Sequence, residues 1–309
     1  MGSVSNSLAS SQSSTRRGSL ADSKADDNAS VDSGFVSGNS SINSLPLVSF
    51  TQPHLKFLNK QLGAMEPHDI LYFCKTLFPN LYQTTAFGLT GLATIDMLSK
   101  IQAANPSSQP VDLIFLDTLY HFQETYALVD RVKARYSNVK VHVFKPVDCD
   151  TVGQFEATYG EKLYEMSSEL YDWVAKVEPQ QRSYEELKVA AVLTGRRRSQ
   201  GGQRGDIDVI EVDEERGIIK INPLVNWSFK EVRSYIAEHN VPYNELLDKG
   251  YKSVGDWHST VPVGENEDER AGRWKGQDKT ECGIHNKKSR YAQFLENQAK
   301  AQQAREDLP

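Results

Sequence analysis

Short apolar runs alternate with amphipathic stretches through the middle of the chain. Four of the runs have the length and composition of buried strands in a parallel sheet: Leu81–Phe87, Val111–Asp117, Val139–Phe144 and Val189–Thr194. Between them lie stretches with helical periodicity: Thr90–Ala103, Phe122–Tyr136 and Thr151–Val177. Strands that alternate with helices predict an α/β fold with a doubly wound, mostly parallel sheet.

Two more elements follow these units. Residues Ile218–Leu224 form another apolar run that predicts a strand. Ser228 and Glu231 then have the spacing of a capping box, which predicts a helix that continues to about His239. Because ligands of doubly wound sheets bind beyond the carboxyl ends of the strands, the loops that follow the strands are the first candidates for a site.

Changes in composition predict three segments. Residues 1–45 are dominated by serine and hold almost no aromatic residues, so we expect a disordered leader. Residues 46–265 carry the periodic pattern of one folded α/β domain. Residues 266–309 turn polar, contain a cysteine motif, and end in a tail rich in Gln, Ala and charged residues.

Composition narrows the class of protein. With 39% hydrophobic and 25% charged residues, the 309-residue chain has the make-up of a globular protein with a large core. No run approaches the roughly 20 apolar residues of a membrane span, and no signal-peptide core follows the N-terminus. Three widely spaced cysteines predict neither a disulfide framework nor a zinc site, which favours a reducing, cytoplasmic compartment. The net charge of −6 argues against general nucleic-acid binding, so an anion site requires a local basic cluster.

One of the three cysteines has sequence neighbours that suit a reactive thiol. Cys282 lies in the cysteine motif Glu281–His285 (ECGIH), whereas Cys74 and Cys149 lie in apolar or mixed runs. A thiolate is the reactive form of cysteine, and nearby cations favour it. Four basic residues stand close by in sequence: Lys279, His285, Lys287 and Lys288. The motif predicts a nucleophile, and an inert cysteine in a charged tail is the alternative.

The first loop, Thr84–Gly91, joins a predicted strand to a predicted helix. Its small and hydroxyl residues would let backbone N–H groups and the helix N-terminus hold an anion. It is neither a Walker A loop nor GxGxxG, because the residues that define those motifs are absent. A tight structural turn is the alternative.

The second loop, Leu116–Thr125, places a carboxylate at the end of a strand. Asp117 is a candidate to contact a ribose or a base edge, and Tyr120 or Phe122 is a candidate to stack on a base. In the alternative interpretation, Thr118 or His121 caps the following helix and Asp117 is solvated.

The arginine loop, Gly195–Arg204, follows a strand with a dense basic cluster and two adjacent glycines. Guanidinium groups suit bidentate recognition of phosphate or sulfate, so this loop predicts an anion site within an acidic protein. A solvated turn or a partner-binding patch is the alternative.

The fourth loop, Gly250–Thr260, mixes aromatic, basic and hydroxyl residues between glycines. This composition suggests ligand contact, and a packed loop around a buried Trp257 is the alternative. His258 is not expected to bind a metal, because no second ligand lies at a useful spacing.

Taken together and in this order, these segments resemble the phosphoadenylyl-sulfate reductases of sulfate assimilation, of the thioredoxin-dependent kind. The resemblance covers about residues 48 to 290. The matching segments are Thr84–Met97, Leu116–Tyr126, Lys176–Arg182, Gly195–Arg204, Lys252–Thr260 and Thr280–His285. The cysteine motif combined with Lys252–Thr260 (KSVGDWHST) is the most specific part.

The resemblance implies an adenine nucleotide α-hydrolase-like α/β fold that binds 3′-phosphoadenylyl sulfate. It assigns the catalytic cysteine to Cys282, in a C-terminal segment expected to be mobile, with His285 orienting or activating the thiol. Attack on the sulfuryl sulfur would expel adenosine 3′,5′-bisphosphate and leave S-sulfocysteine, from which reduced thioredoxin would release sulfite. The reaction would serve assimilatory sulfate reduction and the biosynthesis of cysteine and methionine.

The resemblance also implies how the substrate and a second subunit are bound. The first loop would hold the phosphosulfate end through Thr85, Phe87, Gly88, Leu89 and Thr90. The 3′-phosphate and sulfate charges would be bound by Arg197, Arg198, Arg204 and Lys252. His258 and Thr260 would line the site. A homodimer is expected.

A departure from related sequences predicts the subtype. The related adenylyl-sulfate reductases carry two cysteine pairs that hold an iron–sulfur cluster. Here the first pair's place reads Leu170–Trp173, and Asp256 and Ser259 stand at the second. Three scattered cysteines cannot supply four thiolates, so we expect no cluster, a separate thioredoxin as reductant, and preference for the 3′-phosphorylated substrate.

Two other functions remain as alternatives. An ATP-pyrophosphatase-type adenylyltransferase would have an acidic residue in its pyrophosphate loop, and the first loop lacks one. A nucleotide-binding regulatory protein without turnover would not need Cys282 or His285, and both are present.

Overall fold

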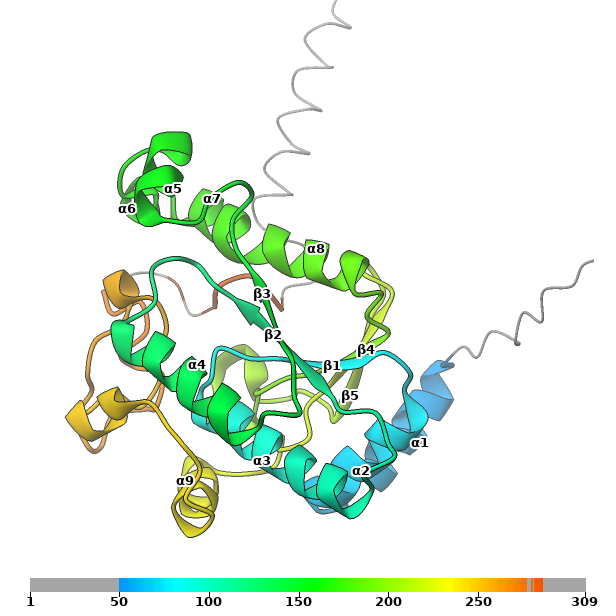
Figure 1. Cartoon of the computed structure of the whole chain (residues 1–309). Coiled ribbons are helices and arrows are strands. Elements are labelled where there is room, and N and C mark those ends of the chain that lie inside the picture. The colour runs from blue at the N-terminus through cyan, green and yellow to red at the C-terminus, as the bar shows by residue number, and fades with distance from the viewer. Residues whose placement is uncertain (1–49, 277–278, 280, 286–309) are drawn as a thin grey trace, which may run out of the picture. The chain divides into compact units, whose positions relative to one another are not determined.

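The structure is a computed structural model that describes residues 50–276, 279 and 281–285, all within the unit Ser49–Pro309. A six-stranded sheet forms the centre of this unit, in the order β3-β2-β1-β4-β6-β5 (Figure 1). Its strands are β1 (Leu81–Thr84), β2 (Asp112–Leu116), β3 (Val141–Phe144), β4 (Ala191–Leu193), β5 (Ile210–Asp213) and β6 (Ile218–Ile221). All neighbours are parallel except β5, which runs antiparallel to β6.

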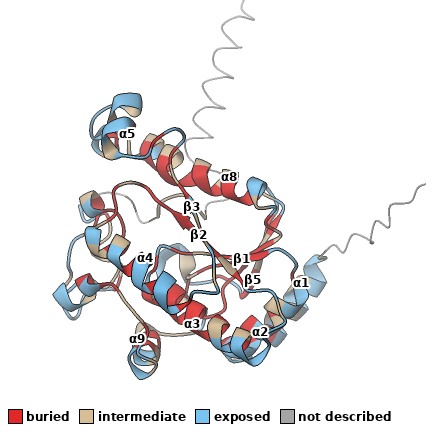
Figure 2. Cartoon of the chain, viewed as in Figure 1, coloured by how far each residue is buried: buried red, intermediate tan, exposed pale blue. Residues whose placement is uncertain are grey.

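Helices cover both faces of the sheet, so the predicted doubly wound α/β fold is confirmed (Figures 1 and 2). The long helices are α1 (Gln52–Leu62), α2 (Pro67–Leu77), α3 (Leu89–Ala104), α4 (Gln123–Arg135), α8 (Glu178–Glu186) and α9 (Phe229–Glu238). One core joins α2, α3, α4 and α9 to one face, and a second core places Tyr184 of α8 against Ile114 and Val192 on the other. The capping box is also confirmed, because the Ser228 side chain accepts from the Glu231 N–H.

The helix predicted over Thr151–Val177 is wrong as a single element. The structure has α5 (Val152–Tyr159), α6 (Leu163–Met166), α7 (Ser168–Asp172) and a π-helical turn, η1 (Trp173–Val177). Gly160 ends α5 with a φ of +97°, and Ser167 caps α7. The π turn lies just before Pro179, whose missing N–H prevents the regular α-helical hydrogen bond at that position.

The strand β5 was not predicted from the sequence. Its four residues alternate apolar and acidic side chains, and it pairs only with β6, through Ile210 opposite Ile221. At this edge of the sheet, the Asn59 side chain of α1 bonds both the N–H and the carbonyl of Ile210, at 2.7 and 2.9 Å. The outer backbone of β5 is therefore partly covered by α1.

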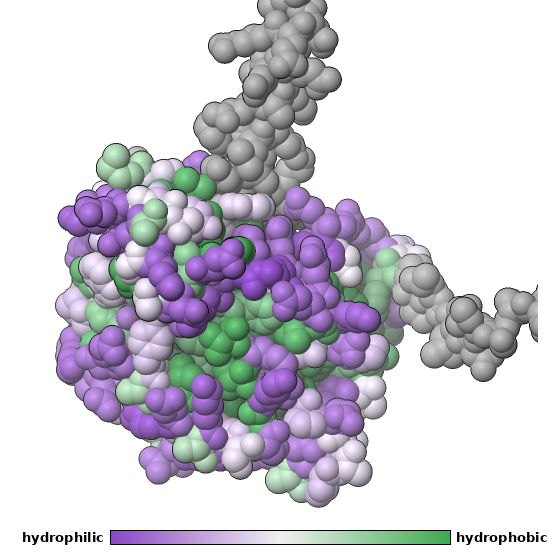
Figure 3. All heavy atoms as spheres, turned by 45° about the horizontal axis from the view of Figure 1, so that its top comes forward, coloured by the Kyte–Doolittle hydropathy of each residue, from purple (hydrophilic) through white to green (hydrophobic). Residues whose placement is uncertain are grey.

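The surface of the described unit carries both hydrophobic and hydrophilic side chains. Figure 3 shows one face on which hydrophobic side chains gather near the centre and hydrophilic ones surround them. Val143 of the edge strand β3 and Val147 just after it are each 43% exposed. Among the described helices, none is long and apolar enough to cross a membrane.

Candidate active site

The carboxyl ends of β1, β2 and β4 border a cavity of about 250 Å³. The first loop, the arginine loop, the fourth loop and the cysteine motif all contribute to its wall, together with residues 269–274. Parallel strands end at the same edge of a sheet, which explains how segments far apart in sequence meet there. The site was predicted at the loops that follow the strands, and this cavity lies at those loops.

The cavity carries an excess of positive charge in an acidic protein. Among the described residues, three carboxylates line it: Asp256, Glu269 and Glu281. Seven basic side chains line it: Lys176, Arg196, Arg197, Arg204, Lys252, Arg270 and Arg273. The whole chain has a net charge of −6. The basic residues are therefore concentrated where an anionic ligand would lie.

The first loop leads into α3, and the N-terminus of this helix lies at the cavity. Phe87 adopts a φ of +57°, and its N–H bonds the Thr85 hydroxyl at 2.9 Å, which turns the chain into Gly88, the N-cap of α3. A Cβ on Gly91 would lie 2.7 Å from the Thr85 hydroxyl, so this tight turn requires glycine there. The first turn of α3 has no acidic residue. Its unpaired N–H groups and the helix dipole favour an anion.

Arg197 of the arginine loop supports the cavity wall from within. It is 2% exposed, and its Nη2 donates to both carboxylate oxygens of Glu269, at 2.8 and 2.6 Å. Its Nε donates to the Thr90 hydroxyl at 2.9 Å, and its Nη1 donates to the Ser199 hydroxyl and the Trp227 carbonyl. The guanidinium thereby joins the first turn of α3 to the loop that carries Glu269.

Arg204 of the same loop contacts the cysteine motif. Its Nε and Nη2 donate to the two carboxylate oxygens of Glu281, at 2.7 and 2.8 Å, and its Nη1 donates to Gln200 at 2.6 Å. Arg270 donates to Glu281 from the opposite loop at 3.3 Å. The residue before Cys282 is thus bound to two arginines of the cavity wall.

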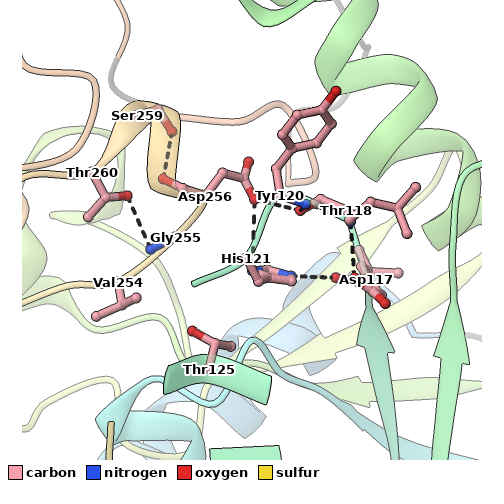
Figure 4. Close-up of polar contacts among 12 residues, drawn as sticks. Asp117, Thr118, Tyr120, His121, Thr125, Val254, Gly255, Asp256, Ser259 and Thr260 are labelled. Carbon is pink, nitrogen blue, oxygen red and sulfur yellow. Dashed lines mark hydrogen bonds and ion pairs between the residues drawn. The ribbon is translucent and has the colours of Figure 1, made fainter. Parts of the chain in front are cut away.

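A buried polar network lies on the other side of the cavity, centred on Asp256 (Figure 4). Asp256 is 2% exposed and accepts hydrogen bonds from Thr118 at 2.6 Å and Tyr171 at 3.0 Å. Lys176 pairs with it at 2.8 Å, and His121 faces it at 3.8 Å. Burial alone would raise the pKa of Asp256, but Lys176 and His121 more than offset that effect and hold this pKa far below its usual range.

Lys176 extends this network toward the thiol. It comes from the π turn η1 and also pairs with Asp172 at 3.0 Å. Burial would lower its pKa, but the two carboxylates raise it, so Lys176 stays charged. Asp172 in addition pairs with Lys279, two residues before the cysteine motif.

Cys282 lies among cations that do not belong to its own motif. It lines the cavity, and its thiolate would interact electrostatically with Lys176, Arg270 and Arg273. Cys74 and Cys149 are buried, and all three cysteines are free. The cavity thus holds one thiol in a cationic environment, which is the arrangement that suits a thiolate nucleophile.

His285 also lines the cavity, but it is neutral. Burial lowers its pKa well below the usual range, and the neighbouring Arg196 and Arg204 lower it further. Its Nδ1 is buried and has no hydrogen-bond partner among the residues that the structure describes. A neutral ring adds no positive charge near Cys282, so any help from His285 would be through position or proton transfer. Lys287 and Lys288 lie outside the described residues.

Ten of the residues predicted from the sequence line the cavity: Thr85, Phe87, Gly88, Leu89, Thr90, Arg197, Arg204, Lys252, Cys282 and His285. Lys252 donates to the carbonyls of Glu265 and Glu267, at 2.6 and 2.7 Å. These hydrogen bonds join the fourth loop to the segment that leads to Arg270.

The other four predicted residues are not part of the cavity lining, and each has protein partners. Asp117 accepts from the Tyr126 hydroxyl at 2.7 Å, and Arg198 donates to the Ile207 carbonyl at 2.9 Å. His258 stacks on Tyr164 with ring centroids 3.8 Å apart. The Thr260 hydroxyl accepts from the Gly255 N–H at 3.2 Å.

The sequence assigned no role in the site to three basic residues around Cys282: Arg270, Arg273 and Lys176, the last of which begins one of the matching segments. Arg270 and Arg273 are separated by three positions in a polar stretch, which by itself does not distinguish them from solvated residues. Lys176 follows an apolar stretch, and it lines the cavity from the π turn. Within the described residues, no group of three or more His, Cys, Asp or Glu side chains could hold a metal ion.

The fold and cavity define an α/β protein that combines a cluster of basic side chains and a thiol at one edge of its sheet. Residues 80–262 match the phosphoadenosine phosphosulfate reductase domain. The chain is 63% identical to the phosphoadenosine phosphosulfate reductase of Emericella nidulans over 86% of each protein. It is 52% identical to that of Saccharomyces cerevisiae over 81% of this chain and 95% of the relative.

A solved structure agrees with these relatives. The crystal structure of phosphoadenylyl-sulfate reductase from Candida auris, a phosphate complex, matches with a TM-score of 0.63 and 53% identity. The match covers 69% of this chain and 99% of that chain. This chain therefore belongs to the phosphoadenosine phosphosulfate reductase family, which confirms the resemblance of its motifs.

Proposed function

We propose that this chain reduces 3′-phosphoadenylyl sulfate to sulfite and adenosine 3′,5′-bisphosphate, with Cys282 as nucleophile and reduced thioredoxin as electron donor. The observation that carries the proposal is the position of Cys282 in a cavity rich in basic side chains and next to the N-terminus of α3. The names of the relatives in Emericella nidulans and Saccharomyces cerevisiae supply the substrate class.

The chemistry divides into two steps. The Cys282 thiolate attacks the sulfuryl sulfur, forming an S–S bond while the S–O bond to the nucleotide breaks. Adenosine 3′,5′-bisphosphate leaves, and Cys282 becomes S-sulfocysteine. A thioredoxin thiolate then attacks Sγ of Cys282 and releases sulfite. The second thioredoxin thiol resolves the mixed disulfide, which regenerates the Cys282 thiol and leaves oxidised thioredoxin.

The protein's own groups suit the first step. Lys176, Arg270 and Arg273 can balance the negative charge of the thiolate and of the sulfuryl group that it attacks. The first turn of α3 offers N–H groups to a phosphate oxygen. Because these donors are fixed by folding, little reorganisation is needed when the nucleotide binds.

An external dithiol is part of the proposal because the cavity lining holds a single thiol. Cys74 and Cys149 are buried in the cores and do not line the cavity. We further propose that the chain works as a homodimer in a reducing compartment such as the cytoplasm. The three free cysteines are compatible with that compartment.

We also propose that the protein works without an iron–sulfur cluster and prefers the substrate that carries the 3′-phosphate. Asp256 and Ser259 stand where related sequences place one cysteine pair, and Asp256 is the centre of the hydrogen-bonded network around Lys176. That network needs no further ligand to balance its charges.

Sulfite release by the purified protein with reduced thioredoxin tests the proposal. We expect sulfite from the 3′-phosphorylated substrate and little from adenylyl sulfate. Equal use of both substrates would contradict the proposal that the basic side chains of the cavity recognise the 3′-phosphate. Absence of sulfite with both would reject the enzymatic proposal and favour a nucleotide-binding protein.

A further inference from the structure

The residue before the nucleophile makes contacts that the proposed chemistry does not use. The Glu281 carboxylate binds Arg204 through two hydrogen bonds, at 2.7 and 2.8 Å, and Arg270 through a third at 3.3 Å. Its side chain is 15% exposed. Burial would raise the pKa of Glu281, but the two arginines outweigh that effect and lower it, so the carboxylate is ionised at neutral pH.

Among the described residues, three contacts hold the segment around Cys282. Lys279 pairs with Asp172 on the side of the buried network, and Ile284 packs against the core that contains Tyr184. Glu281 is the anchor adjacent to the sulfur-bearing residue, and it is bound to arginines that themselves line the cavity. A change at this contact therefore affects the position of Cys282 relative to a bound nucleotide.

We infer that Glu281 is a positioning residue, whose ion pairs with Arg204 and Arg270 hold Cys282 in the cavity for attack. This inference rests on the proposed function. Two charge-assisted bonds to one guanidinium fix the direction of the carboxylate as well as its distance. Since Cys282 is the next residue, this orientation limits the positions that its Sγ can take.

The variant Glu281→Gln tests the inference because it keeps the shape of the side chain and removes its charge. We expect the single-turnover rate of S-sulfocysteine formation at saturating substrate to fall about tenfold, which is the usual effect of losing a charged hydrogen bond. Affinity for adenosine 3′,5′-bisphosphate should change much less. Glu281→Asp should recover part of the rate, because it retains the charge.

Alkylation of Cys282 by iodoacetamide without substrate gives a second readout. Glu281→Gln should accelerate it, since a less firmly held segment exposes the thiol more often. The matched control is Glu265→Gln, which removes the charge of an exposed carboxylate in the neighbouring loop and should behave like wild type. Peptide mapping, with Cys282→Ser as background, assigns the label to this thiol.

Two results would overturn the inference. Unchanged single-turnover and alkylation rates in Glu281→Gln would show that the ion pairs do not position the thiol. Tighter binding of the bisphosphate with an unchanged single-turnover rate would show that Glu281 only occupies an anion site. Alkylation needs no turnover, so this measurement stands even if wild-type protein forms no sulfite, a result that would reject the proposed function alone.

Discussion

Two charged groups border the same cavity and differ in how their charges are balanced. In the buried network, Lys176 lies between the carboxylates of Asp172 and Asp256, and its side chain is only 7% exposed. In the arginine cluster, Arg204 and Arg270 share the carboxylate of Glu281, and these side chains are 11–15% exposed. The first group satisfies its own charges and acts as scaffold. The second places two guanidinium groups on one carboxylate at the cavity wall, where an anionic ligand would lie.

The largest expected effect comes from Cys282→Ser, which removes the nucleophile and leaves both groups in place. Sulfite formation should fall by at least about 10³-fold, as is typical when a nucleophile is removed. Binding of adenosine 3′,5′-bisphosphate, measured by calorimetry, should remain. Such a result would separate the binding function of the two groups from the chemistry, whereas substantial turnover in this variant would contradict the covalent mechanism.

Asp256→Asn tests the scaffold role of the buried network. It would leave Lys176 with Asp172 as its remaining carboxylate partner, and breaking a buried ion pair costs about 3 to 5 kcal/mol of stability. Urea denaturation measures the change in the free energy of unfolding. A loss below about 1 kcal/mol would mean that the pair resembles a surface salt bridge, and the contrast between the two groups would not hold.

The buried network also predicts a pH dependence of stability through His258. Burial lowers the pKa of His258 from 6.5 to about 4, so the unfolded state binds more protons than the folded state between these values. Stability should therefore be complete above about pH 6.5 and decrease as the pH falls toward 4, by up to about 3 kcal/mol from this residue. Its neutral state in the fold is consistent with its stacking on Tyr164.

His258→Phe provides the matched variant for this measurement. It keeps a flat ring for stacking and removes the titrating group, so the slope of stability against pH between 4 and 6.5 should become smaller. His285, whose pKa is also lowered, contributes in the same direction and will leave part of the slope. An unchanged slope in His258→Phe would show that His258 is not held neutral by the fold.

The elements predicted from the sequence were those with strong local signals. Periodicity located β1, β2, β3, β4 and β6, and the Ser228–Glu231 spacing located the start of α9. β5 was not predicted because its four residues, two of them acidic, run directly into the charged turn that joins them to β6, so the short strand has the composition of a loop. The break of the helix after Tyr159 depends on the positive φ of Gly160, which composition only suggests.

Site residues that belong to a sequence motif could be predicted. Site residues whose role depends on which side chains pack against them in the fold could not. The cysteine motif and the first loop could be located because their residue types have few structural uses at those positions. The sequence could not distinguish the roles of Arg197, whose nitrogens are taken up by protein partners, and Arg204, which reaches the cysteine motif. That difference depends on Glu269 and Glu281, which are far from the arginine loop in sequence.

Arg204→Gln gives the smallest and most specific effect. Because Arg204 belongs to the arginine cluster and is not needed to balance a buried lysine, its loss should weaken binding of adenosine 3′,5′-bisphosphate about tenfold. The free energy of unfolding should change less than in Asp256→Asn, because Glu281 keeps Arg270 as a partner. Calorimetry and urea denaturation on both variants give the two quantities. If Arg204→Gln destabilised the protein as much as Asp256→Asn does, the arginine cluster would be scaffold as well, and the anion would have to be bound chiefly by the α3 N-terminus and the remaining basic side chains of the cavity.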